Sequence, residues 1–233
     1  MIVLVIQSSF VSNSNAASCG PNSDCSIFLQ TCSSDLCICD VGNNWQNPTQ
    51  MQTIRRAQAS VADNIGNVFV FGDYVSLFGL TNTAEKYLTS SNSWSYINPL
   101  PNPLANINGV FINDKIYIPG DINNPNLYIY TVSTGSWDIP LINKQSNGIT
   151  NLDGRWGYQL CNIANNIYMI GGIINGGTYT NQLWVLDVTT DIDVTNGIAK
   201  WSQLTLMSLC RFGFASAVIL GKSRWLVVNM TVV

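Results

Sequence analysis

The sequence predicts an all-β fold built from a repeated unit. Its composition favours strands and turns, because β-branched, aromatic, Gly and Asn residues are frequent while Lys and Arg together number 10 of 233 residues. The apolar content of 46% is enough to build a core. Three apolar runs that end in glycine recur along the chain, at 68–73, 116–121 and 167–172. Little or no α-helix is expected.

The spacing of these runs indicates a repeat. Gly72 and Gly120 are 48 residues apart, and Gly120 and Gly171 are 51 apart. Each run is apolar and is followed by a turn signal, as a buried strand would be. Self-similarity at such a period is typical of repeat architectures, in which each unit buries its apolar face against its neighbours.

Other positions keep the same register. Sixteen residues before the glycines stand Arg56, Leu104 and Arg155, and Arg211 begins a fourth copy, since the tetrapeptides RWGY and RFGF are alike. After each glycine, a second apolar strand ends in a turn and a tryptophan. The tryptophans at these strand ends are Trp94, Trp137 and Trp201, and Trp45 precedes the first copy. A loop insertion is expected around 143–150, where the second copy is longer.

A repeat of about 50 residues with a glycine pair after an apolar strand, then Tyr and Trp at set offsets, resembles the kelch repeat. The third copy is the most similar, because it has the full Gly171-Gly172 doublet. Asp73 and Asp121 replace the second glycine in the other copies. The resemblance covers about residues 41–228 and implies a kelch-type β-propeller of about three and a half four-stranded blades.

The resemblance divides the propeller region, 41–233, into repeats. They span 55–102, 103–153 and 154–209, with the start of a fourth at 210–233. Because closed propellers typically take about 4 to 8 blades, we expect an incomplete ring with an open strand edge that favours self-association. Two explanations stay open, a fragmentary gene product and a ring completed by dimerisation.

The repeat positions are expected to be structural. Glycine allows a sharp and closely packed turn. The tryptophans are expected to pack between blades, and Arg56, Arg155 and Arg211 to tie together the loops of neighbouring blades. No residue is assigned a catalytic role.

The N-terminal region predicts secretion. Residues 1–18 are interpreted as a signal peptide, because an apolar run leads to small residues, although an ordinary buried first strand is the alternative. A cysteine-rich segment, 19–40, follows. Its cysteines are Cys19, Cys25, Cys32, Cys37 and Cys39. Such crowding predicts disulfides, and we therefore expect an extracellular or cell-surface protein.

Two points about this region stay open. A zinc site is less favoured than disulfides, because the chain has no histidine and no paired C-x-x-C spacing. The odd cysteine is free or bonds elsewhere, to Cys161 or Cys210.

Near the other end of the chain, one acceptor motif for N-glycosylation begins at Asn229.

Composition also excludes several function classes. Without histidine, the chain cannot supply Ser-His-Asp or Cys-His catalysis or His-ligated metals, and copper-radical oxidation is excluded with them. Ten scattered cations and a net charge of −3 argue against nucleic acid as a partner. No stretch is long and apolar enough to predict a membrane span. No cofactor is expected.

Kelch propellers bind partners through loops on one face of a rigid frame. The corresponding loops here are 73–83, 121–126 and 173–182. Their candidate binding residues are Tyr74, Phe78, Asn123, Asn124, Asn175 and Tyr179. Solvated turns are the alternative reading of these loops.

The sequence therefore predicts a secreted or cell-surface scaffold that binds a protein or a carbohydrate without catalysis. The alternative is a carbohydrate-active propeller enzyme, an epimerase or hydrolase that uses carboxylates, or an inactive fragment of one.

Overall fold

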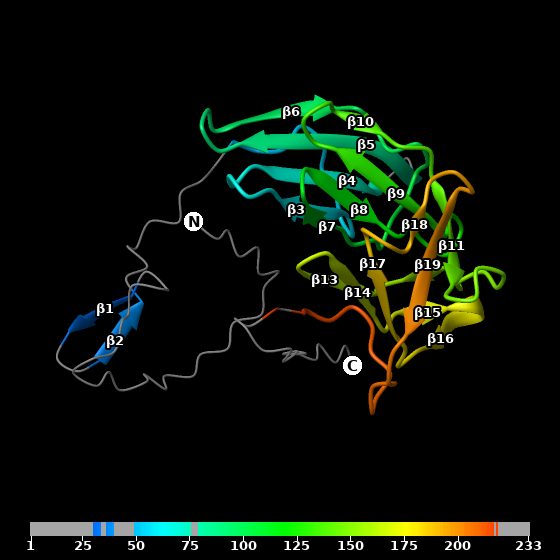
Figure 1. Ribbon diagram of the computed structural model, residues 1–233. Helices are drawn as coiled ribbons and strands as arrows, with labels where there is room; N and C mark the ends of the chain where they lie inside the picture. Colours follow the sequence, from blue (N-terminus) through cyan, green and yellow to red (C-terminus); the bar gives the residue numbers. More distant parts are fainter. Residues whose placement is uncertain (1–29, 34–35, 40–48, 76–78, 217, 219–233) are drawn as a thin grey trace. The chain divides into compact units, whose positions relative to one another are not determined.

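The computed structural model describes residues 30–33, 36–39, 49–75, 79–216 and 218 (Figure 1). The chain divides into two compact units, one within residues 2–48 and one from Thr49 onward. In the first unit, β1 (Gln30–Ser33) pairs antiparallel with β2 (Leu36–Cys39), and this register sets Cys32 opposite Cys37.

Several predictions concern parts outside this description. They are the signal peptide, the side chains of the crowded cysteines, Trp45, Phe78 and Asn229. These stay predictions. Cys161 and Cys210 are described, and both are free thiols in the structure.

The second unit is all-β, and its described part contains three antiparallel β-meanders of four strands each. The first meander comprises β3 (Ala59–Ala62), β4 (Val68–Val75), β5 (Gly79–Leu88) and β6 (Ser93–Ile97). The second comprises β7 (Val110–Ile112), β8 (Lys115–Ile118), β9 (Asn126–Thr131) and β10 (Ser136–Trp137). The third comprises β13 (Gln159–Ile163), β14 (Asn166–Ile170), β17 (Leu183–Asp187) and β19 (Ile198–Gln203).

Shorter strands connect and edge these meanders. β11 (Leu141–Gln145) pairs antiparallel with β9 and parallel with β19, so it joins the second and third meanders into one sheet. Part of the expected loop insertion is therefore a strand. A small three-stranded sheet contains β12 (Arg155–Trp156), β15 (Ile173–Ile174) and β16 (Thr178–Tyr179), and β18 (Ile192–Asp193) pairs with β19.

Helical structure is minimal. A 3₁₀ turn, Asn175–Gly177, is the one helical element of the described second unit. No helix in the described ranges is long and apolar enough to cross a membrane.

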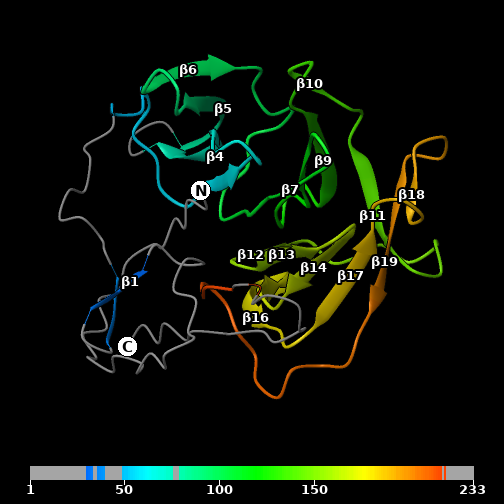
Figure 2. The same ribbon diagram turned by 60° about the vertical axis from the view of Figure 1, so that its left-hand side comes forward.

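The second meander is buried on both faces, because alternate residues of a strand point to opposite sides of the sheet. Ile116 and Tyr130 pack with Phe71 of the first meander. Leu127 and Ile129 belong to a second core, whose third-meander members include Leu160, Ile167, Leu186 and the fully buried Trp201. The three meanders thus pack in chain order, and Figure 2 shows their succession.

Two of the predicted turn glycines make close backbone contacts. Gly72 has φ +69° and Gly171 has φ +59°, conformations that L side chains rarely adopt. A Cβ atom on either would lie 2.4 Å from a carbonyl oxygen, that of Leu104 or Arg211 respectively. Each glycine therefore lets its meander approach the beginning of the next repeat.

A ladder of backbone hydrogen bonds links the beginnings of four repeats. The N–H of Asn106 donates to Ala57 O, that of Gly157 to Asn106 O, and that of Gly213 to Gly157 O, at 2.8, 3.0 and 2.8 Å. All four residues have a positive φ, between 53° and 64°. The same conformation at the same place in each copy defines the repeat register.

This register corrects the predicted arginine position in the first copy. Arg155 lies two residues before Gly157 of the ladder, and Arg55, not Arg56, lies two residues before Ala57. The β3–β4 hairpin is the cause, because 12 positions separate Ala59 from its partner Phe71, whereas 11 separate the corresponding pair in the third meander. The turn at 63–67 holds the extra residue.

Candidate functional site

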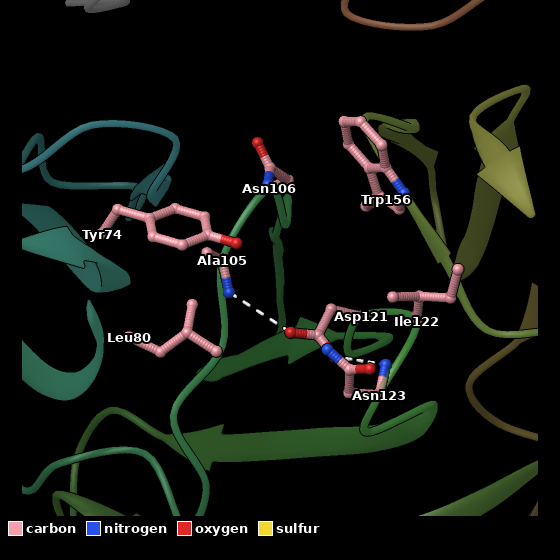
Figure 3. Close-up of a pocket in the computed structure, with 8 residues that line it drawn as sticks. All are labelled: Tyr74, Leu80, Ala105, Asn106, Asp121, Ile122, Asn123 and Trp156. Atoms are coloured by element: carbon pink, nitrogen blue, oxygen red, sulfur yellow. Dashed lines mark hydrogen bonds between the residues drawn. The ribbon is translucent and has the colours of Figure 1, made fainter. Parts of the chain in front are cut away.

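A cavity of about 140 Å³ lies where the beginnings of the second and third repeats meet strands β4 and β5 of the first meander and the loop after β8 of the second. Its lining residues, all shown in Figure 3, are Tyr74, Leu80, Ala105, Asn106, Asp121, Ile122, Asn123 and Trp156. Tyr74 and Leu80 come from β4 and β5, residues 121–123 follow β8, and Trp156 belongs to β12.

Asp121 shapes one wall of the cavity. Its side chain is buried, and its Oδ1 atom accepts the backbone N–H groups of Asn123 and Asn124, both at 2.9 Å. Its Oδ2 atom faces the N–H of Ala105 at 3.4 Å. The aspartate that replaces the second kelch-like glycine therefore organises the loop after β8 and attaches it to the beginning of the second repeat.

Asn106 is placed in the cavity by the backbone ladder. It adopts φ +53°, a left-handed conformation that Asn tolerates better than most residues. Its N–H and C=O groups are both used in the ladder.

Three lining side chains present hydrogen-bonding groups to solvent rather than to a described protein group. The indole N–H of Trp156 and the side-chain amides of Asn106 and Asn123 have no partner among the residues that the structure describes. The indole N–H groups of the four other described tryptophans all donate to protein oxygens, those of Trp94, Trp137, Trp184 and Trp201. The cavity thus gathers unused donors and acceptors.

Tyr74 brings an aromatic ring to the opposite wall. In Figure 3 its hydroxyl points from the first meander toward the middle of the cavity, and Trp156 stands on the far side. The guanidinium of Arg56 lies over the Tyr74 ring, 5.4 Å from its centroid. This cation–π contact fixes the ring plane.

Tyrosines behind the cavity are structural and protonated. Tyr158 donates to Gly120 O at 2.8 Å, and Tyr128 donates to Asn102 Oδ1 at 3.0 Å. Burial, with a smaller contribution from the Asp121 charge, raises the pKa of Tyr128 to about 12. Burial is also the main cause of the raised pKa of Tyr158. These hydroxyls therefore serve the fold and are unsuited to acid–base chemistry near neutral pH.

The predicted loop residues separate into two places. Tyr74 and Asn123 line the cavity, and Asn124 supports its wall through backbone hydrogen bonds. Asn175 instead donates to Asp153 at 3.1 Å, and the exposed Tyr179 contacts Phe212 with 4.9 Å between ring centroids.

The predicted tryptophans and arginines have structural contacts. Trp201 is fully buried between the second and third meanders, and Trp137 lies edge-on to Phe71 of the first meander. Trp94 packs on Tyr87 within its own meander. Arg155 is buried and donates to Gly171 O.

Sequence reasoning missed Trp156 and Asn106. Trp156 directly follows the repeat position Arg155, and Asn106 lies two residues after the repeat position Leu104. The place of Trp156 in the RWGY tetrapeptide is the signal that could have identified it. In the described part of the chain, no group of three metal-ligating residues forms.

Comparisons with known proteins give a fold likeness. No family model matches the sequence, and no curated protein matches it. Among solved structures, the chain is similar to the one described as the structure of YjhT, with a TM-score of 0.54 and 19% identity. The match covers 70% of this chain and 55% of that one, so this chain spans about half the length of its structural neighbour. At this identity the likeness concerns the fold alone.

Proposed function

We propose that residues 49–218 belong to a kelch-type β-propeller that acts as a binding module, without catalysis, through the cavity around Trp156. Three consecutive four-stranded meanders, packed in chain order and linked by the 57–106–157–213 ladder, support a propeller. The sequence register of glycines and tryptophans supports the kelch type.

The solvent-accessible polar groups of Trp156, Asn106 and Asn123, which no described protein group engages, carry the proposal that the cavity binds a ligand. Ligand sites place a few polar groups among apolar and aromatic ones, where they orient the ligand. A cavity of about 150 Å³ admits a molecule the size of benzene, so the present 140 Å³ admits the ring of one sugar, whose hydroxyl groups would extend beyond it.

These features favour a carbohydrate over a peptide. A sugar ring offers several hydroxyls to amide and indole groups, and an aliphatic face to an aromatic ring. A peptide bound in extended form relies mainly on main-chain hydrogen bonds along a sheet edge, whereas the free polar groups found here are side-chain amides and an indole. A sugar-binding module fits the secreted location that the sequence predicts, and we retain that location as part of the proposal.

The alternative, a carboxylate-based enzyme, has less support. Glycoside hydrolysis generally uses two carboxyl groups on either side of the bond that is cleaved. Asp121 is the one carboxylate among the described lining residues, and its oxygens face backbone N–H groups.

An array of glycans and peptides, probed with the labelled chain, tests the proposal. Trp156→Phe and Asn123→Ala should each weaken glycan binding about tenfold, since each removes a hydrogen bond worth about 1–1.5 kcal/mol. The matched controls are Trp137→Phe, whose N–H donates to Asn98 O, and Asn64→Ala at an exposed position of the 63–67 turn. Equal binding by all four variants, or binding to peptides alone, would overturn the proposal.

A further inference from the structure

A row of aromatic side chains continues from the cavity along one face of the β12–β15–β16 sheet. Trp156 is directly opposite Ile173, and Ile173 is directly opposite Tyr179. Directly paired residues of antiparallel strands lie on the same face of a sheet. Because neighbouring strands are about 4.8 Å apart, the backbones of Trp156 and Tyr179 are separated by about 10 Å.

Phe212 lies beside Tyr179 and close to Gly157, the residue that follows Trp156. Its ring lies 4.9 Å from that of Tyr179, between centroids, and the ring planes are tilted by 41°. Near Trp156, a Cβ atom on Gly157 would meet Cβ and Cδ2 of Phe212 at 3.8 and 3.9 Å. We call Trp156, Phe212 and Tyr179 the aromatic row.

The aromatic row is accessible. Tyr179 is 52% exposed and Phe212 is 39% exposed, and Trp156 is partly exposed. Large rings left open to solvent side by side are typical of binding surfaces. Asn175 stands in the turn between β15 and β16, toward the Thr178 end of β16, and its amide donates to Asp153.

We propose that the ligand is a neutral oligosaccharide, with one sugar in the cavity and the following sugars stacked on Phe212 and Tyr179. This inference rests on the proposed function and extends it from one ring to a chain. The length of the row, about 10 Å beyond the cavity, requires more than one sugar. The rings and amides of the site offer stacking and hydrogen bonds, which suit uncharged hydroxylated rings.

The test compares ligands of different length. Glucose, galactose, mannose and N-acetylglucosamine are titrated calorimetrically against the full chain, beside the linear trimers of each sugar. In at least one series, the trimer should bind ten times more tightly than the monomer. Tyr179→Ala should remove this advantage and leave the affinity for the monomer unchanged, and Tyr179→Phe should keep the advantage because it retains the ring.

The outcomes separate the inference from the proposed function. Tyr96→Ala, at an exposed tyrosine on β6, is the control and should leave both affinities unchanged. If monomer and trimer bind equally, or if Tyr179→Ala has no effect on the trimer, the inference is wrong while the cavity remains a sugar site. If Trp156→Phe has no effect on any monomer that binds, the proposed site is wrong. Binding by charged glycans alone would overturn the neutral class. Circular dichroism of each variant verifies folding.

Discussion

The first and third meanders each cover a buried arginine at an equivalent repeat position, but the hydrogen-bond partners of the two arginines differ in charge. Arg55 donates to Gly72 O at 3.0 Å and to Thr83 O at 2.8 Å, and it forms an ion pair of 2.7 Å with Glu85. Both side chains of this pair are fully buried. Arg155 donates to Gly171 O at 3.3 Å and to the neutral Oε1 atom of Gln182 at 3.0 Å.

The pairing register explains the difference. In the first meander Phe71, before the glycine, pairs with Ala84, and in the third meander Ile170 pairs with Leu183. Glu85 therefore corresponds to Trp184, which belongs to the apolar core. Where the first meander has the carboxylate that pairs with Arg55, the third meander has an apolar side chain in its core.

The two arginines differ electrostatically as a result. Burial lowers the pKa of Arg155 to about 10, with partial compensation from Asp153 and Tyr158. Burial alone would raise the pKa of Glu85, but hydrogen bonds from Arg55, Gln52 and Thr53 outweigh it and lower that pKa. The comparison teaches that one repeat position can hold a buried cation either by an ion pair or by neutral acceptors.

The largest expected effect comes from replacing the charged partner of Arg55 in the first meander by a neutral amide. Glu85→Gln should reduce the free energy of unfolding by about 3–5 kcal/mol, because it leaves the buried Arg55 without its counter-ion. The N–H groups of Gln52 and Thr53, which Glu85 accepts at 2.7 and 3.0 Å, would also face an amide NH₂. Urea denaturation measures the change.

A surface ion pair provides the control for this prediction. Lys115 and Asp138 are 2.9 Å apart, and their side chains are 38% and 39% exposed. Asp138→Asn should therefore cost at most about 1 kcal/mol. Similar losses in the two variants would show that burial adds nothing to the Arg55–Glu85 pair.

The next effect tests what the two meanders share. Gly72→Ala and Gly171→Ala should each cost about 1–2 kcal/mol for a left-handed conformation and about 1–3 kcal/mol for overpacking against the carbonyl 2.4 Å away. Gly197→Ala is the matched control, since its φ is +66° and no atom lies within 4 Å of its Cβ position. It should show the conformational cost alone, as measured by thermal unfolding. Equal costs at the three positions would refute the close approach between repeats.

Much of the fold could be predicted from sequence because the repeated residues are those that a left-handed backbone conformation and a buried strand require. Gly72 and Gly171 must be small and left-handed, and apolar runs before them form the central strands. Arg55 was missed because one extra residue in the β3–β4 turn shifts the count, and adjacent arginines gave no means of choosing. β11 was missed because its pairing with β19 joins distant parts of the chain.

The candidate site was harder to predict than the fold. Asn123 could be found because it follows a turn glycine on an expected loop. Tyr74 follows Gly72 as predicted, but it lies in strand β4 and not in the expected loop. Trp156 could not be distinguished from a packing residue, since only its missing hydrogen-bond partner among the described residues sets it apart from the other tryptophans. Whether an indole N–H has a hydrogen-bond partner depends on which residues the fold brings near it, so the sequence alone does not reveal it.

A smaller effect is expected from acid. Because the pKa of Glu85 is lowered in the folded state, its contribution to stability is present above the unfolded pKa and is lost as the pH falls through the folded pKa. The wild-type chain should therefore lose more stability than Glu85→Gln when the pH falls from 6 to 3. Urea titrations at these pH values measure the difference between the two proteins, which should shrink on acidification. A constant difference would contradict the lowered pKa.

The smallest effect comes from giving Arg155 of the third repeat a charged partner. Gln182→Glu places a carboxylate where the amide oxygen accepts Arg155 Nη2, and that oxygen also accepts the indole N–H of Trp184 at 3.1 Å. Because a hydrogen bond to a charged group contributes about 1 kcal/mol more than a neutral one, and Gln182 is only partly buried, stability should rise by about 1 kcal/mol. Gln203→Glu, at an exposed position on β19, should change it little. Equilibrium denaturation at pH 7 measures both, and the gain should disappear below the pKa of the new carboxyl group. A loss of stability in Gln182→Glu would instead mean that desolvation of the carboxylate exceeds its attraction to Arg155, so that the neutral acceptor is the better solution in this meander.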